Sequence, residues 1–104
     1  MIGLEHYLTL SGMLFTLGLC GVMMRRNVIL VLMSVEIMLN AANVALVAFN
    51  KHLAVTNPSP DGQVFVFFTI AVAAAEAAVA LVIAMALFRR LDTVNVDDVA
   101  NLRW

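Results

Sequence analysis

The chain has 104 residues, of which 63% are hydrophobic and 12% are charged, and its formal net charge is −1. This length allows one domain, and a composition this apolar is typical of an integral membrane protein rather than a soluble one. The charge is close to neutral and there is no Lys/Arg-rich run, so we expect no nucleic acid partner. The single cysteine, Cys20, cannot form an intrachain disulfide, and we interpret it as a small packing residue.

The first apolar segment covers about residues 2–24 and ends at the polar run Arg25-Arg26-Asn27. A signal peptide carries its positive charges before the apolar run, whereas here the two arginines follow it. We therefore expect a membrane-spanning helix. Small and polar residues recur on one face of this helix at spacings of three or four, and we expect that face to pack on a neighbouring helix. These residues are Glu5, Thr9, Gly12, Thr16 and Cys20.

The second apolar segment, about residues 28–49, contains one acid, Glu36. Asn40 and Asn43 follow it at i+4 and i+7, so the three polar side chains share one helical face. Unsatisfied polar groups are costly in hydrocarbon, so this face is predicted to meet other helices or a hydrated cavity. We interpret the two asparagines as interhelical hydrogen-bonding residues and Glu36 as a functional group.

The third apolar segment, about residues 64–88, contains a single charged residue, Glu76. A carboxylate near the middle of a span costs about 2.5–3.5 kcal/mol on insertion scales, so it marks a proton or ion path or a polar contact within a bundle. Thr69 and several small residues share the face of Glu76, which leaves space beside the carboxylate.

These segments predict an all-α membrane protein with a single three-helix domain over residues 1–104. A polar loop, 50–63, joins the second and third spans, and the tail 89–104 is too polar for the bilayer, so we expect it to dock against a partner. Arginine pairs follow the first and third spans, so the positive-inside rule makes that side cytoplasmic. The N-terminus and the loop are then outside, and the C-terminal tail is cytoplasmic.

The two acids are predicted to lie at similar depth. Glu36 comes ten positions after Arg26 and Glu76 thirteen positions before Arg89, which places them about 15 Å and 20 Å from the cytoplasmic ends of their helices. Burial favours the protonated form of a carboxyl group, which can release its proton when water or a cation approaches. Glu36 and Glu76 on adjacent helices therefore suggest a proton relay.

Other chemistry has no support in the sequence. We find no cysteine cluster for iron–sulfur ligation, no histidine pair at haem-ligand spacing within a span and no glycine-rich phosphate loop. We therefore expect no catalytic residue, no metal site and no cofactor site in this chain.

Four motifs occur in order along the chain, and the similarity that they mark extends over nearly the whole chain, including the tail segment Val94-Asn-Val-Asp97. They are Leu17-Gly18-Leu-Cys-Gly21 with Arg25-Arg26-Asn27, Glu36-Ile-Met-Leu-Asn40-Ala-Ala-Asn43, Asp61-Gly62-Gln63, and Ala73-Ala-Ala-Glu76-Ala-Ala-Val-Ala-Leu81. With this spacing the chain resembles the smallest membrane subunit, called subunit K or mitochondrial subunit 4L, of the proton-pumping NADH:quinone oxidoreductases, respiratory complex I.

The resemblance implies a multi-pass subunit in the bacterial inner (plasma) membrane, in contact with lipid and with antiporter-like and quinone-proximal subunits. It implies that Glu36 and Glu76 are stations of a proton path that is coupled to quinone reduction. Arg25 and Arg26 would support that coupling, and Asn40, Asn43 and Thr69 are supporting candidates. NADH, FMN, iron–sulfur clusters and quinone would belong to other subunits.

Alternative functions differ in testable ways. A small subunit of multisubunit sodium/proton antiporters has a similar length and number of spans, but the pairing of Glu36 and Glu76 with Asp61-Gly62-Gln63 fits the respiratory subunit better. Small multidrug exporters have four spans, and ATP synthase rotor subunits are two-helix hairpins, each with one acid. A purely structural assembly subunit would tolerate Glu76→Gln without loss of pumping.

Overall fold

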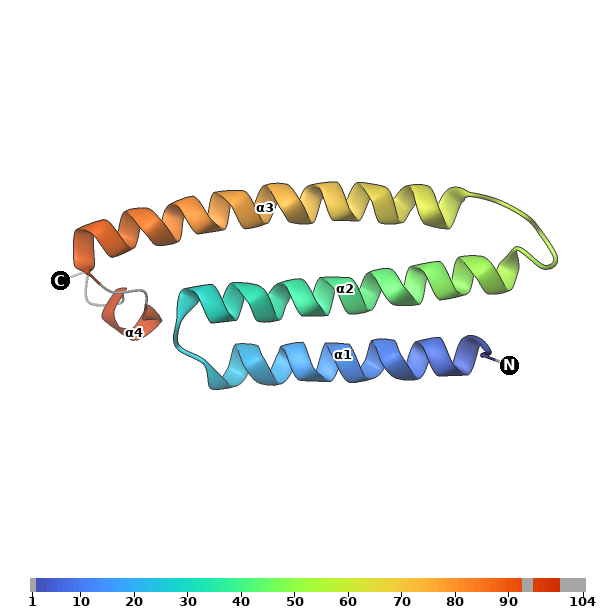
Figure 1. Cartoon of the computed structure of the whole chain (residues 1–104), viewed down its shortest axis with the longest axis horizontal. Coiled ribbons are helices and arrows are strands. Elements are labelled where there is room, and N and C mark those ends of the chain that lie inside the picture. The colour runs from blue at the N-terminus through green and yellow to red at the C-terminus, as the bar shows by residue number, and fades with distance from the viewer. Residues whose placement is uncertain (1, 93–94, 100–104) are drawn as a thin grey trace.

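Three long helices and one short helix make up the fold (Figure 1). The computed structural model describes residues 2–92 and 95–99. The helices are α1 (Leu4–Met24), α2 (Val28–Leu53), α3 (Asp61–Leu91) and α4 (Val96–Val99). Helices α1, α2 and α3 are each long and apolar enough to cross a membrane, which confirms the prediction of an all-helical chain with three membrane-length helices.

The three long helices form one layer with α2 in the middle, and α2 runs antiparallel to both α1 and α3 (Figure 1). The molecule measures 59 × 24 × 19 Å along its principal axes. Helix α2 packs against both α1 and α3, and its contact with α1 is the more extensive. A carboxylate on the α3 side of α2 therefore has α3 as its nearest neighbour within the chain.

Helices α2 and α3 extend beyond the apolar segments from which they were predicted, to Leu53 and back to Asp61. Several interactions and conformations mark the ends of these helices. The Asn27 side chain accepts a hydrogen bond from the Ile29 N–H at 2.9 Å and so caps the start of α2. Asp61 places a negative charge in the first turn of α3, and Asp92, with a φ of 57°, ends that helix in a left-handed conformation.

Helices α1 and α2 approach each other closely at a glycine. A Cβ atom on Gly18 would lie 2.5 Å from Met38 Cγ and 2.7 Å from the backbone oxygen of Ser34. The buried Ser11 hydroxyl donates a 2.6 Å hydrogen bond to the Ala41 carbonyl across the same interface. Small residues and an interhelical hydrogen bond are the contacts that hold helices together in lipid, where apolar burial gives little advantage.

The face of α1 that was predicted to pack on a neighbouring helix does not pack on α2. Thr9, Gly12, Thr16 and Cys20 are exposed and line an open groove of about 610 Å³ together with Met13 and Leu17. Packing of that face on a neighbouring helix therefore stays a prediction that concerns another chain, because α1 carries small residues on two faces and α2 uses the other one.

Different segments of the chain lie at the two ends of the layer. The N-terminus and the 54–60 connection lie at one end, where Lys51 Nζ sits 5.3 Å from the centroid of the Tyr7 ring (Figure 1). The α1–α2 connection, the end of α3 and α4 lie at the other end (Figure 1). The arginine pairs at 25–26 and 89–90 are therefore at the same end of the molecule.

Candidate functional site

Glu36 lies on the side of α2 that meets α3. Its side chain is half-buried and lines a pocket of about 340 Å³ between the two helices. The other residues that line this pocket are apolar: Ile29, Leu32, Met33, Ile37, Ala77 and Leu81. Within the chain, this carboxyl group is therefore surrounded mainly by hydrocarbon.

Glu76 lies on α3 and is exposed in the isolated chain. It borders a second pocket of about 340 Å³, lined also by Ala75, Val79, Ala80 and Ile83. The space predicted beside this carboxylate is therefore present. It opens to the outside of the chain, because α3 presents small side chains on both sides of Glu76.

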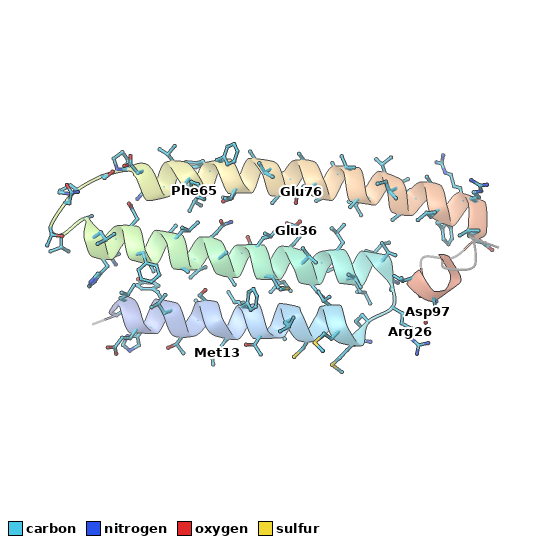
Figure 2. All side chains as sticks on the ribbon, turned by 180° about the vertical axis from the view of Figure 1, so that it is seen from behind. Met13, Arg26, Glu36, Phe65, Glu76 and Asp97 are labelled. Carbon is cyan, nitrogen blue, oxygen red and sulfur yellow. The ribbon has the colours of Figure 1, made fainter. Side chains whose placement is uncertain are left out.

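Figure 2 places the two glutamates at matching positions along α2 and α3. The structure thus brings both acids to the same level on neighbouring antiparallel helices. Within the described part of the chain, neither carboxylate has a hydrogen-bond or ion-pair partner. A carboxylate at membrane depth needs such a partner, and here water or another chain must supply it.

The supporting polar residues of α2 have different environments. The Thr69 hydroxyl of α3 lies 2.7 Å from Asn43 Oδ1 and 2.8 Å from the Val66 carbonyl, so its single proton can be donated to either oxygen. This contact joins α2 to α3 on the loop side of the glutamates. Asn40 is exposed, and its side chain has no hydrogen-bond partner among the residues that the structure describes.

Arg25 and Arg26 lie in the short α1–α2 connection, and both are exposed. Arg26 Nη1 is 3.3 Å from Asp97 Oδ2, and the Arg26 carbonyl accepts a 3.0 Å hydrogen bond from the Val96 N–H. Asn27 and Asn95 form an isolated antiparallel bridge beside these contacts. The C-terminal segment therefore lies against this connection of its own chain.

The described part of the tail contacts the 25–27 connection of its own chain, and the expected docking of the tail against a partner stays a prediction. Residues 93–94 and 100–104 of the predicted tail lie outside the described residues. Sequence reasoning did not identify Asp97 as a neighbour of Arg26. A short irregular tail has no periodicity to show what it touches, and the run of acids at 97 and 98 is the only signal that could have suggested an arginine partner.

No group of three or more His, Cys, Asp or Glu side chains that could hold a metal ion occurs in the described ranges 2–92 and 95–99. The acids of the membrane-length helices are one residue on each of α2 and α3, together with residues at the helix ends. Such an arrangement can hold or transfer protons between two positions.

The comparisons with known proteins all indicate the same family. Residues 6–104 match the family described as NADH-ubiquinone/plastoquinone oxidoreductase chain 4L. NADH-quinone oxidoreductase subunit K of Bdellovibrio bacteriovorus is 50% identical over 98% of this chain and 92% of its own length. Subunit K of Nitrosomonas europaea is 51% identical over 99% of both chains, and subunit K 1 of Geotalea daltonii is 46% identical over the full length of both. This chain therefore belongs to the NADH-ubiquinone/plastoquinone oxidoreductase chain 4L family.

Proposed function

We propose that this chain is a membrane-arm subunit of a proton-translocating NADH-quinone oxidoreductase and that it relays protons through Glu36 and Glu76. Membership in the chain 4L family and the names of its full-length relatives support the first part. One observation carries the second part. Two carboxylates without partners in the described chain lie at the same level on neighbouring antiparallel membrane-length helices.

The proposed relay uses the different surroundings of the two acids. Glu36 is half-buried among apolar side chains at the α2–α3 interface, so it serves as the internal position of the relay. Glu76 opens to the outside of the chain, where a neighbouring subunit or its bound water can deliver or accept a proton. Water or one intervening side chain would link the two carboxyls, because they lie at the same level on neighbouring helices.

The remaining site residues have supporting roles in this proposal. Asn43 and Thr69 hold α2 against α3 and so keep the two glutamates in register. Asn40 is a polar residue one turn from Glu36, available to water or to a neighbouring chain. Arg25 and Arg26 lie at the α4 end, where they support coupling to the quinone-proximal subunits.

Redox chemistry is assigned to other subunits of the complex in this proposal, so NADH, FMN, iron–sulfur clusters and quinone are bound elsewhere. The chain is placed in the bacterial inner membrane with its N-terminus outside and its tail in the cytoplasm, as the arginine pairs indicate. Its direct neighbours are the antiporter-like and quinone-proximal membrane subunits and lipid.

The test is proton transport by the complex reconstituted in vesicles, with NADH as the electron donor. Glu36→Gln and Glu76→Gln keep the size of the side chain and remove the transferable proton, so each is expected to lower transport at least about tenfold, as loss of a positioned acid or base does. Glu5→Gln makes the same change at the end of α1 and should leave transport unchanged. A purely structural subunit would show full transport in all three variants.

A further inference from the structure

The chain around the start of α4 contacts the α1–α2 connection through three interactions. The Val96 N–H donates a 3.0 Å hydrogen bond to the Arg26 carbonyl, and Asn27 and Asn95 form an antiparallel bridge. The carboxylate of Asp97 lies 3.3 Å from the guanidinium group of Arg26, and Figure 2 shows the two residues beside each other. Backbone and side-chain contacts therefore hold the two segments together at consecutive residues.

These contacts join the end of α3 to the start of α2. Asp92 ends α3 with a φ of 57°, a left-handed conformation that aspartate tolerates and that an α-helix cannot continue. Helix α4 lies beside the α1–α2 connection, at the same end of the layer as the last turn of α3 (Figure 1). Because α4 follows α3 in the chain, contacts that hold α4 at the connection also limit how far the end of α3 can move from α2.

Hydrogen bonds join α2 directly to α3 only on the loop side of the glutamates, within the residues that the structure describes. The Thr69 hydroxyl lies 2.7 Å from Asn43 Oδ1, and the Gly62 N–H donates a 3.3 Å hydrogen bond to Asn50 Oδ1. On the arginine side of the glutamates, the two helices therefore depend on apolar packing and on contacts from outside the helices.

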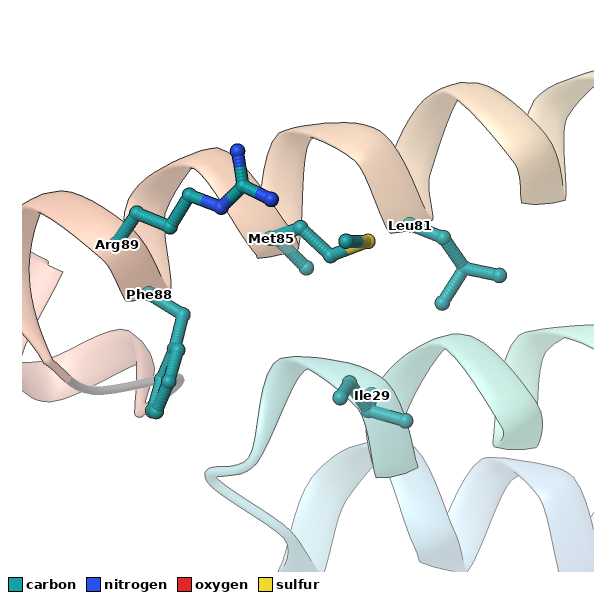
Figure 3. Close-up of a pocket in the computed structure, with 6 residues that line it drawn as sticks. Ile29, Leu81, Met85, Phe88 and Arg89 are labelled. Atoms are coloured by element: carbon teal, nitrogen blue, oxygen red, sulfur yellow. The ribbon is translucent and has the colours of Figure 1, made fainter.

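Apolar packing is incomplete on the arginine side. A pocket of about 340 Å³ lies between the start of α2 and the last turns of α3. Figure 3 shows Leu81 and Phe88, which line this pocket, extending from α3 towards the part of α2 that carries Ile29. The contacts at α4 therefore supply the polar attachment that the α2–α3 interface lacks at this end of the described chain.

We propose that residues 95–97 form a clasp that holds the end of α3 at the α1–α2 connection, and that Arg26 acts through this clasp. Arg26 holds the tail, whereas Arg25 is exposed, has no ion-pair partner among the described side chains and is left for another subunit. This division of roles rests on the proposed function, in which the arginine pair supports coupling. The clasp itself does not depend on proton transfer by the two glutamates.

Disulfide formation tests the clasp in the whole complex. The hydrogen bond from Val96 to Arg26 flanks the bridge, so residues 27 and 95 form a pair of the narrow, non-hydrogen-bonded type, with Cα atoms about 4.5 Å apart. A disulfide can span this distance. In a Cys20→Ser background, the Asn27→Cys/Asn95→Cys variant should therefore form a disulfide on mild oxidation, detected by mass spectrometry of the digested complex. A complex that assembles without forming this disulfide would overturn the proposal.

Exchange of the two charges tests the ion pair. In the two-cysteine variant, Arg26→Asp and Asp97→Arg each place like charges together and should slow disulfide formation about fivefold, the upper value for an exposed pair. The two changes combined restore opposite charges and should return the rate to within about twofold. Every variant carries the same two cysteines, so the loss of the Asn27 cap affects all of them equally.

Arg25→Asp is the matched control for the charge change at Arg26. It makes the same change one residue earlier, away from the ion pair, and should leave the rate of disulfide formation within about twofold. Equal slowing by Arg25→Asp and Arg26→Asp, or no recovery in the exchanged pair, would overturn the assignment of Arg26 to the clasp.

NADH-driven proton transport by complexes without the added cysteines tests the role of Arg26 in coupling. Arg26→Asp should lower transport several-fold, and addition of Asp97→Arg should restore it to within about twofold. Restored disulfide formation without restored transport would show that Arg26 acts on another subunit and would overturn its assignment. Undiminished transport in Arg26→Asp would contradict the coupling role in the proposed function, whereas the disulfide rates, measured without turnover, decide whether the clasp exists.

Discussion

Glu36 and Glu76 lie at the same level of the helix layer but in different surroundings. Glu36 is half-buried between α2 and α3, whereas Glu76 is exposed beside small residues on α3. In the proposed relay, this difference in exposure determines which position each glutamate takes. Glu36 is the internal station, and Glu76 is the station that meets the next subunit.

The hydrogen bond between Thr69 and Asn43 gives a prediction for a single residue. Thr69→Val keeps the shape of the side chain and removes the hydroxyl that lies 2.7 Å from Asn43 Oδ1. We expect the unfolding free energy to fall by about 0.6 kcal/mol, the average for hydrogen bonds between membrane helices. Denaturant titration of the purified subunit in detergent micelles measures this change.

Thr16→Val is the matched control for that experiment. The Thr16 hydroxyl donates to the Gly12 carbonyl within α1 and joins no second helix. Its loss should change the unfolding free energy by less than half as much. Equal losses for the two variants would show that the Thr69–Asn43 contact contributes nothing specific to the α2–α3 interface.

The sequence identified Glu36 and Glu76 because an acid within an apolar segment is costly and therefore conspicuous. It also indicated that Asn43 forms interhelical contacts. The partner of Asn43 depends on the register between α2 and α3, which is determined by packing and by the 54–60 connection rather than by any local pattern. The contact of Asp97 with Arg26 was missed for a related reason, since it joins an irregular tail to a connection distant in sequence.

Helix α1 shows what the spacing of small and polar residues can predict and what it cannot. The sequence predicted a span over about residues 2–24, and the structure has a membrane-length helix from Leu4 to Met24. The spacing did not decide which of two small-residue faces packs on α2, because both permit close approach of backbones. The face with Gly18 packs on α2, and the face with Gly12 is left for a neighbour outside this chain in the proposed complex.

Substitution of these two glycines tests the assignment of faces. Gly18→Ala introduces a Cβ atom against the Ser34 backbone oxygen, so the helices must move apart, at a cost of about 1–3 kcal/mol for overpacking. At Gly12 an added Cβ atom meets nothing within 4 Å, so Gly12→Ala should be neutral or slightly stabilising in the same subunit. Unfolding of each variant in detergent micelles measures the difference. A larger loss for Gly12→Ala than for Gly18→Ala would mean that α1 presents its other face to α2.

The whole molecule is a thin layer that buries little of its own surface. Its buried hydrophobic side chains, within the described residues, are those of Ala41, Ala48 and Ala84. Large apolar side chains such as Phe67 and Met23 are 72% and 78% exposed, so both broad faces of the layer require lipid or other subunits. This shape suits a subunit that depends on its neighbours, as the proposed function requires.

The proposed orientation predicts which end of the layer reacts from outside the cell. In a Cys20→Ser background, Ser59→Cys should react with a membrane-impermeant maleimide in intact cells, because residue 59 lies in the connection at the N-terminal end. Arg90→Cys, at the opposite end, should react only in inverted vesicles. The reverse pattern would show that the arginine end faces outward and would overturn the assignment from the positive-inside rule.

The most direct test of the central claim is proton transport per NADH oxidised in the Glu36→Gln/Glu76→Gln double variant, compared with each single variant. If both glutamates are stations of one relay, removal of either interrupts the same path, and the double variant will transport no less than the slower single variant. Additive losses on a logarithmic scale would contradict a single relay. Undiminished transport in both single variants would contradict any role of these carboxylates in proton transfer.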